Sequence, residues 1–360
     1  MTELRAYLQH LGFIAFSLFV VLTQADEHVP RVIIVAQNSG SEITDLLVPF
    51  AILSEAGMDV EILSTEEGPV NLMNGMELLG LRTLKSYGDK RVDLVVIPAV
   101  HFPNQKKLIE WLDQIYERGA MLASICDGVE VLASAGLLNG RRATGHFYSM
   151  KRRESNYPKV NWVENVRYIH DGRAFSTAGV SASIPAAVYL VEHMLGSDVA
   201  KVVAQHYGVD RSNSSHHNSG EFAIGAKEVF VGVRNYVLGF SKTRYNIKIS
   251  PLVDEYLLAL TIDALGRTYR TSITLDMENP EVTTMRGLKF RSKPVHKSPH
   301  WIVQLYSGPA DQEAVNTLIV EGPSQLFQRI FQHIESAFGR DSAEFVATQL
   351  ELSSTALSFE

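Results

Sequence analysis

Short apolar runs alternate with amphipathic segments from Arg31 onward. Residues 32–36 form a β-branched run typical of a buried parallel strand, and apolar positions then recur at helical spacing from Ile43 until Gly57. Ser41 or Thr44 is expected to cap this first helix. The alternation predicts strands at 58–63, 92–98, 121–125, 160–163 and 174–176, a short hairpin at 69–79, and helices at 107–118, 128–135 and 182–195. This order predicts an α/β fold with a parallel sheet sandwiched by helices.

The only cysteine, Cys126, lies between an apolar run and a helical segment. A strand that stops at one polar residue and turns directly into a helix exposes that side chain at the edge of a sheet, as in a nucleophile elbow. The positive end of a helix from Asp127 would lower the pKa of the thiol, whereas the Asp127 charge would raise it. A buried cysteine is more often a small core residue, so this stretch alone is weak evidence for a nucleophile.

The predicted strands also suggest where a ligand binds. Parallel α/β sheets bind ligands outside the carboxyl ends of their strands. Residues 98–101, Cys126 and the start of the first helix are therefore expected to share one crevice.

The C-terminal third contains segments that resemble segments of the N-terminal part, as in an internal repeat. Residues 42–75 are matched by 254–287, and residues 175–200 by 319–343, with glycine, serine, aspartate and alanine recurring at a constant offset. About thirty residues separate the two matched parts in the second copy, against roughly a hundred in the first, and they contain no cysteine. We expect residues 245–353 to form a truncated, degenerate α/β copy that packs on a first domain over 30–206.

The segment between the two copies, 207–244, is expected to be a linker with a polar loop at 210–220. His216 and His217 are adjacent in this loop, but no cysteine or carboxylate accompanies them at the spacing of metal ligands. A solvated loop is the simpler interpretation. The sequence predicts neither a metal site nor a cofactor.

Composition narrows the class of protein. A hydrophobic fraction of 46% and a charged fraction of 20% are those of an ordinary globular protein. The formal net charge of −7 and the lack of a long basic cluster argue against nucleic acid as a partner. The short basic run Lys151–Arg153 is expected to be a solvated helix face.

The N-terminus has the three-part layout of a signal peptide. Residues 1–10 are polar, residues 11–22 are almost entirely apolar, and Thr23-Gln24-Ala25 precedes two acidic residues. The apolar run is shorter than the roughly 20 residues that span a bilayer, which favours a cleaved peptide at 1–25 over a retained anchor. We expect export to the periplasm or the extracellular space, with an uncleaved membrane anchor as the alternative. A lone cysteine in an oxidising compartment is either buried and inert or reactive.

Several motifs carry a resemblance to a known family. Ser124–Gly128, Ala133–Thr144, His146 and Thr177–Ser181 occur in the order found in the ThiJ/PfpI family of the class I glutamine-amidotransferase-like superfamily, which has a flavodoxin-like fold. The branch with the isonitrile hydratases and the amidase-like domains of AraC-type regulators is the most similar. The resemblance covers about residues 30–206.

The resemblance implies roles for several residues. In this family a carboxylic acid four residues before a proline hydrogen-bonds the cysteine, and Asp45 before Pro49 matches it. A protonated Asp45 could donate to the sulfur and later pass a proton to a substrate. Alternatively, the Asp45 carboxylate only interacts favourably with the helix dipole and has no catalytic role. His146 resembles the family's third active-site residue, with a histidine that merely lines a polar crevice as the alternative.

The sequence also departs from the family pattern. The backbone N–H of Asp127 matches half of the family's oxyanion hole, and Val100 would supply the other half. However, the turn after the third strand is usually Pro-Gly-Gly, whereas here it is Pro98-Ala99-Val100-His101. Family proteases carry histidine directly after the cysteine and isonitrile hydratases usually carry threonine, where this chain has Asp127. His101 is a candidate base or positive group from the opposite side.

Three functions are compatible with these residues. The first is an exported cysteine-dependent hydrolase or hydratase that acts on a small carbon electrophile through Cys126. The second is a protein of the same fold that binds a small metabolite without catalysis, and the third is a redox sensor in which Cys126 is oxidised to sulfenic acid. The family often forms homodimers, but a fused second copy could occupy the surface that a partner would use.

Overall fold

The computed structural model describes residues 28–72, 75–209, 225–240, 242–249, 253–275, 281–292, 298–305, 316–320 and 322–352. The predicted signal peptide and the loop with His216 and His217 lie outside these residues. No helix among the described residues has the length and apolar character needed to cross a membrane.

The N-terminal part is built on a seven-stranded sheet with the order β10-β11-β7-β6-β1-β2-β5. Its strands are β1 (Arg31–Ala36), β2 (Asp59–Ser64), β5 (Arg82–Thr83), β6 (Leu94–Ile97), β7 (Met121–Ser124), β10 (Tyr168–Asp171) and β11 (Ala174–Thr177). Every neighbouring pair is parallel except β10 with β11, which is antiparallel. The predicted α/β fold with a mainly parallel sheet is confirmed.

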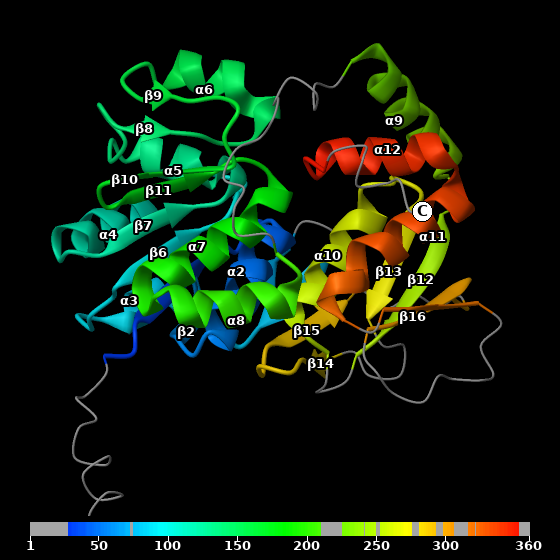
Figure 1. Ribbon diagram of the computed structural model, residues 1–360, viewed down its shortest axis with the longest axis horizontal. Coiled ribbons are helices and arrows are strands. Elements are labelled where there is room, and N and C mark those ends of the chain that lie inside the picture. The colour runs from blue at the N-terminus through cyan, green and yellow to red at the C-terminus, as the bar shows by residue number, and fades with distance from the viewer. Residues whose placement is uncertain are drawn as a thin grey trace, which may run out of the picture. The chain divides into compact units, whose positions relative to one another are not determined.

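Helices cover both faces of this sheet (Figure 1). Alternate residues of a strand point to opposite faces. Val32 and Ile34 of β1 accordingly belong to the core under α2 (Ile43–Glu55), α7 (Ser183–Leu195) and α8 (Ser197–Tyr207). Ile33 and Val35 belong to the core under α3 (Leu84–Tyr87), α4 (Lys106–Glu117) and α5 (Val129–Ser134).

The N-terminal cap of α2 differs from the prediction. Glu42 caps the helix, because its side chain accepts a hydrogen bond from the backbone N–H of Asp45 at 2.6 Å. The hydroxyl of Ser41 instead accepts from the backbone N–H of Gln37 at 2.8 Å. Thr44 lies inside the helix, where its hydroxyl donates to Asp263 at 3.3 Å. The expectation of a cap at Ser41 or Thr44 was wrong because both hydroxyls are bonded elsewhere.

The C-terminal part has its own, smaller parallel sheet with the order β13-β12-β16-β17. Its strands are β12 (Thr243–Lys248), β13 (Thr271–Leu275), β16 (Trp301–Gln304) and β17 (Thr317–Ile319), and its helices are α10 (Glu255–Gly266), α11 (Leu326–Phe338) and α12 (Arg340–Gln349). The segment predicted as a linker contains a further helix, α9 (Ala226–Leu238). Buried Asn235 attaches α9 to α12 by donating to the hydroxyl of Ser342 at 3.1 Å.

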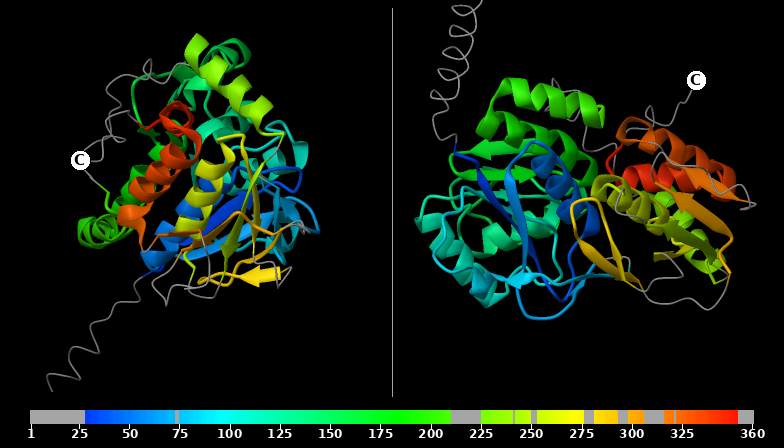
Figure 2. Two further views of the ribbon diagram at one scale, coloured as in Figure 1. Left: turned by 90° about the vertical axis from the view of Figure 1, so that its right-hand side faces the viewer. Right: turned by 90° about the horizontal axis from the view of Figure 1, so that it is seen from below.

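An antiparallel sheet and a pair of helices join the two parts (Figure 2). Strands β3 (Val70–Asn71) and β4 (Met76–Leu79) share a sheet with β14 (Glu281–Thr283) and β15 (Lys289–Ser292), and β4 pairs with β15 antiparallel. Helices α2 and α10 pack on each other through their buried residues. Two glycines with similar left-handed backbones lie near this junction, Gly75 with φ 84° and Gly287 with φ 83°.

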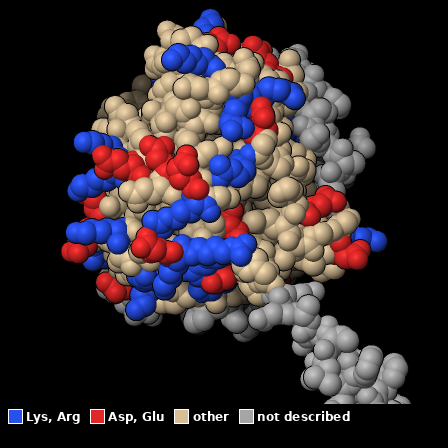
Figure 3. Space-filling view, turned by 90° about the vertical axis from the view of Figure 1, so that its left-hand side faces the viewer, with Lys and Arg blue, Asp and Glu red and all other residues tan. Residues whose placement is uncertain are grey.

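Several shorter elements complete the structure. They are β8 (Arg142–Ala143), β9 (Asn161–Trp162), α6 (Met150–Asn156) and the 3₁₀ helices η1 (Cys126–Gly128), η2 (Phe147–Ser149), η3 (Val180–Ala182) and η5 (Pro323–Gln325). On the face in Figure 3, basic and acidic side chains lie next to one another. That face therefore carries no extended patch of only positive or only negative side chains.

Candidate functional site

Cys126 lies at the carboxyl edge of the central sheet, two residues after β7 and at the first position of η1. Its backbone is left-handed, with φ 56°, which is uncommon for a residue with a side chain. The backbone N–H of Cys126 donates to the hydroxyl of Thr177 at 3.3 Å, so the ends of β7 and β11 are tied together at this point. The side chain is almost buried, at 8% exposed.

The turn at Cys126 packs tightly on the end of β6. The backbone N–H of Ile125 donates to the carbonyl of Ile97 at 2.9 Å. A Cβ atom on Gly128 would clash with the carbonyl oxygens of Ile97 and Pro98. Position 128 therefore requires glycine, because η1 lies directly against the carbonyl groups of Ile97 and Pro98.

Asp45 of α2 is fully buried at the same edge. Its Oδ2 accepts a hydrogen bond from the backbone N–H of Ala99 at 3.1 Å, while its Oδ1 has no hydrogen-bond partner. Burial raises the pKa of Asp45 to about 7, although the Ala99 N–H and the charge of Arg267 act in the opposite direction. Within the described residues Asp45 and Cys126 make no direct hydrogen bond.

The pKa of the Cys126 thiol is raised well above its ordinary value. Burial is the largest cause, followed by the negative charges of four carboxyl groups. These groups belong to Asp45, Asp127, Glu351 and Glu42. The expectation that a helix N-terminus lowers the thiol pKa was wrong, because α5 begins only at Val129 and the acidic surroundings dominate. The expected opposing effect of Asp127 is confirmed.

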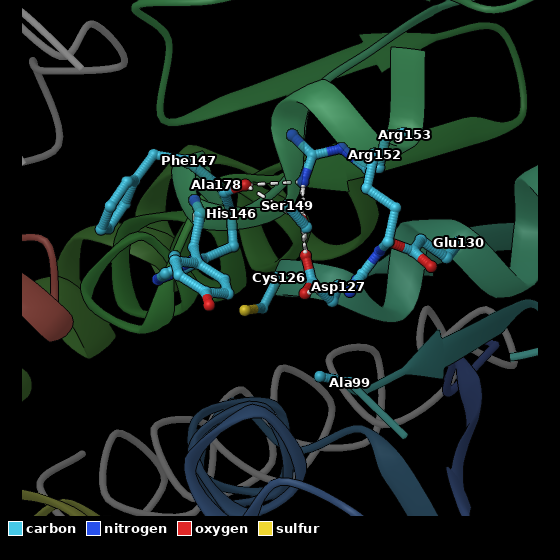
Figure 4. Close-up of polar contacts among 12 residues, drawn as sticks. Ala99, Cys126, Asp127, Glu130, His146, Phe147, Ser149, Arg152, Arg153 and Ala178 are labelled. Atoms are coloured by element: carbon cyan, nitrogen blue, oxygen red, sulfur yellow. Dashed lines mark hydrogen bonds and ion pairs between the residues drawn. The ribbon is translucent and has the colours of Figure 1, made fainter. Parts of the chain in front are cut away.

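The Asp127 side chain extends toward α6 and away from the sulfur, which lies on the side of His146 (Figure 4). Its carboxylate accepts from the hydroxyl of Ser149 and lies 3.3 Å from Arg153 and 3.5 Å from Arg152. Arg153 also donates to the backbone carbonyl of His146 at 2.6 Å. Because Arg153 is only 3% exposed, the expectation of a solvated basic face at 151–153 was wrong for this residue.

His146 faces two groups other than the thiol. Its Nδ1 accepts from the backbone N–H of Tyr148 at 3.3 Å, and its Nε2 lies 3.8 Å from Oε1 of Glu351. Its ring also lies against Phe147, with 4.5 Å between ring centroids. The described residues include no hydrogen bond between His146 and Cys126, so His146 forms part of the wall of the site.

The turn after β6 contains the remaining predicted residues. Val100 forms a β-bridge with Ser41, and the two hydrogen bonds of this bridge use the carbonyl of Ala99 and the N–H of His101 rather than the N–H of Val100. The imidazole of His101 is exposed, and its Nδ1 lies 3.0 Å from the carbonyl oxygen of Ser39. Among the described residues His101 makes no hydrogen bond with Cys126.

Sequence reasoning missed the contribution of the C-terminal part to this site. Arg267 directly follows α10 and lies 3.7 Å from Glu42, and its guanidinium is close enough to Cys126 for their charges to interact. Glu351, after α12, contacts His146. Arg267 falls in the matched segment 254–287, which was one available signal, whereas no motif pointed to Glu351. No cluster of three or more histidine, cysteine or acidic residues suited to a metal occurs in the described part of the chain.

The fold and this site together define a parallel α/β domain with one cysteine at the carboxyl edge of its sheet and a buried acid on the first helix. The model of the DJ-1/PfpI family matches residues 30–193. The chain belongs to the DJ-1/PfpI family through this domain, which confirms the predicted ThiJ/PfpI resemblance.

Characterised relatives differ in what their names say they do. The chain is 32% identical over 153 residues to the HTH-type transcriptional regulator CdhR of Pseudomonas aeruginosa, a match that covers 42% of this chain and 45% of the regulator. It is 27% identical over 163 residues to deglycase PH1704 of Pyrococcus horikoshii, covering 44% and 93%. It is 24% identical over 166 residues to isonitrile hydratase of Pseudomonas putida, covering 44% and 70%. The chain thus spans less than half the length of the regulator.

Solved structures also match this part of the chain. DJ-1beta of Drosophila melanogaster aligns with a TM-score of 0.47 at 20% identity, and the alignment covers 51% of this chain and all of that one.

Proposed function

We propose that the protein is a cysteine-dependent enzyme of the hydrolase or hydratase class, which acts on a small carbon electrophile through Cys126. One observation carries this proposal: the buried Asp45 beside Cys126 has an unpartnered carboxyl oxygen and a pKa raised to about 7. A general acid–base is most effective when its pKa lies near the working pH. Asp45 is therefore suited to exchanging protons at neutral pH.

The raised pKa of Cys126 means that Asp45 would have to act as a base toward the thiol. The resting sulfur is a thiol, so attack on an electrophilic carbon requires a base that takes its proton. Ionised Asp45 accepts this proton as the carbon–sulfur bond forms, and protonated Asp45 then donates it to the heteroatom of the substrate. In a hydrolysis the protonated heteroatom then leaves the carbon, whereas in a hydration it stays bound. Water attacks the carbon as the carbon–sulfur bond breaks, and one of its protons passes to the sulfur while the other stays with the product.

We further propose that Cys126 sits on a nucleophile elbow. Its left-handed backbone, its place two residues after the central strand β7 and the close packing of Gly128 on the end of β6 support this assignment. The N–H groups of Val100 and Asp127 stay the candidate donors to a developing oxyanion. His101 and His146 stay candidates for contact with the substrate, because neither is bonded to the thiol in this structure.

A panel of small electrophiles tests the enzyme proposal. Aldehydes, isonitriles, nitriles and short amides would be incubated with the wild type, Cys126→Ser, Asp45→Asn and the control Asp113→Asn, whose side chain is exposed on α4. We expect one class to be turned over, with kcat/KM reduced by at least about 100-fold in Cys126→Ser and Asp45→Asn and unchanged in the control. Full activity in Cys126→Ser would rule out the sulfur as nucleophile.

A second candidate is a protein that binds a small metabolite without turnover. The almost buried thiol with a raised pKa favours it, as does the similarity to a protein named as a transcriptional regulator. Calorimetry with the same compounds distinguishes the two candidates: equal binding to the wild type and Cys126→Ser, with turnover by neither, supports a binding protein. The low thiolate population disfavours the redox-sensor hypothesis, and mass spectrometry after mild peroxide treatment tests it.

We also propose that the chain is exported, on the basis of the layout of residues 1–25. N-terminal sequencing of protein from the secreted or periplasmic fraction would find Asp26 as the first residue. Recovery of the full N-terminus in membranes would support the anchor instead. The matched segments 42–75 and 254–287 support a proposal that the C-terminal part is a degenerate copy, packed on α2.

A further inference from the structure

Glu351 is a buried acid that the proposed mechanism does not use. It follows α12 at the C-terminal end of the described chain and is 3% exposed. Its Oε2 accepts from the backbone N–H of Gly179 at 2.7 Å, and its Oε1 accepts from the N–H of Phe147 at 3.3 Å. The same Oε1 lies 3.8 Å from Nε2 of His146. One carboxylate thus binds two turns of the N-terminal domain.

The main chain of Glu351 reinforces these contacts. Its carbonyl accepts from the hydroxyl of Ser181 at 2.9 Å, and the carbonyl of Leu350 accepts from the N–H of Ser181 at 3.1 Å. At Gly179 a Cβ atom would clash with the Glu351 carboxyl group. The turn around Gly179 is therefore shaped to receive this carboxylate.

The backbone of Glu351 also indicates a role for its side chain. Its φ is 55°, in the left-handed region where a helix usually ends in glycine. Gly208, which ends α8, lies as far beyond Gly196 as Glu351 lies beyond Gly339, and its φ is 67°. The left-handed conformation is unfavourable for a residue with a side chain, and the hydrogen bonds of the carboxylate offset this cost.

Both turns that Glu351 holds flank the thiol. Thr177, two residues before Gly179, accepts the hydrogen bond of the Cys126 backbone N–H. His146 and Phe147 lie on the side toward which the sulfur points (Figure 4). The charge of Glu351 is also one of those that raise the pKa of Cys126.

We infer that Glu351 is a positioning residue of the Cys126 site, through which the C-terminal part of the chain orders the two turns beside the thiol and adds negative charge to it. This inference rests on the proposed function in one respect, namely that Cys126 is the functional residue of the site. The contacts of Glu351 do not depend on turnover. The C-terminal part is thus a component of the site and not only its support.

Substitutions at Glu351 and Gly179 test the inference through the pH profile of Cys126 alkylation by iodoacetamide. Glu351→Gly removes the carboxylate and relieves the left-handed backbone, Glu351→Gln removes only the charge, and Gly179→Ala displaces the carboxylate. The control is Glu344→Gln, on the helix α12 that precedes Glu351, in an exposed ion pair with Lys227. The charged groups that face Cys126 are Asp45 and Glu42 of the α2 region, Asp127 of η1, Arg153 of α6, Arg267 after α10 and Glu351 itself.

Loss of the Glu351 charge lowers the pKa of Cys126, so we expect alkylation at pH 8 to be about three- to tenfold faster in Glu351→Gly and Glu351→Gln. Gly179→Ala should shift the profile in the same direction, and adding it to Glu351→Gly should change nothing further. Glu344→Gln should match the wild type. A purely structural role would lower Tm without moving the profile. Wild-type profiles in Glu351→Gly, Glu351→Gln and Gly179→Ala would overturn the inference, whether or not the protein turns over a substrate.

Discussion

At the scale of single residues, Cys126 and Asp45 form a pair whose pKa values are both raised by a shared buried environment. The negative charge of Asp45 is also among the causes that raise the pKa of Cys126, so ionisation of Asp45 makes the thiol harder to deprotonate. The neutral state, with a thiol and a protonated carboxyl group, dominates below about pH 7. The first proton to leave at higher pH comes from the pair's more acidic member, which is Asp45.

This shift makes the free energy of unfolding depend on pH. The folded protein holds the Asp45 proton up to about pH 7, whereas an unfolded chain releases it near pH 4. The stability contributed by this raised pKa is therefore full below about pH 4 and is lost as the pH rises to about 7. We expect Asp45→Asn to gain stability relative to the wild type across this window, by about 2–4 kcal/mol at pH 8, in urea unfolding measured from pH 4 to 8.

Glu344 provides a control of opposite sign for that experiment. Its pKa is lowered by its hydrogen bond to Lys227 and by Arg340, so its contribution is present at neutral pH and is lost on acidification. Glu344→Gln should therefore differ from the wild type at pH 8 and approach it at pH 4. A difference between Asp45→Asn and the wild type that stays constant with pH would contradict a raised Asp45 pKa.

At the scale of elements, the site depends on how closely η1 approaches the end of β6. Gly128 has no room for a Cβ atom beside the carbonyl oxygens of Ile97 and Pro98. We expect Gly128→Ala to lower the free energy of unfolding by about 1–3 kcal/mol, because the backbone of η1 must move. Gly322→Ala is the matched control, since a Cβ atom there meets no neighbour within 4 Å and the backbone is extended. Equal unfolding free energies for both variants, from urea titrations, would contradict the close approach.

The elements around Cys126 could be predicted because each one depends on local sequence. Apolar periodicity located β7 and α2, and the motif at 124–128 located the turn with the cysteine. The contacts of Arg153 and Glu351 could not be predicted in this way. Arg153 lies in a basic run that resembles a surface helix, and only its contact with Asp127 across 26 residues makes it part of the site. Glu351 reaches Gly179 across 172 residues, a distance at which no spacing pattern carries information.

At the scale of the described chain from residue 31 onward, the two α/β parts share one core instead of meeting at a thin interface. Nearly every residue of α2 and α10 is buried, including polar Thr44, Asp45 and Asp263. Removing either helix would expose apolar side chains and leave buried charges without partners, which costs several kcal/mol. The tight junction explains how a C-terminal residue can act at a cysteine of the N-terminal domain.

A shared core predicts that both parts unfold in one transition. The three tryptophans report on them separately, because Trp111 and Trp162 lie in α4 and β9 while Trp301 lies in β16. In urea, the fluorescence of Trp301→Phe follows the N-terminal domain, and that of the double variant Trp111→Phe/Trp162→Phe follows the C-terminal part. We expect each fluorescence transition to coincide with that variant's own loss of helical circular dichroism. Earlier unfolding of the part with Trp301 would mean that it is an independent domain, and that Glu351 can leave the Cys126 site without unfolding the sheet that holds the thiol.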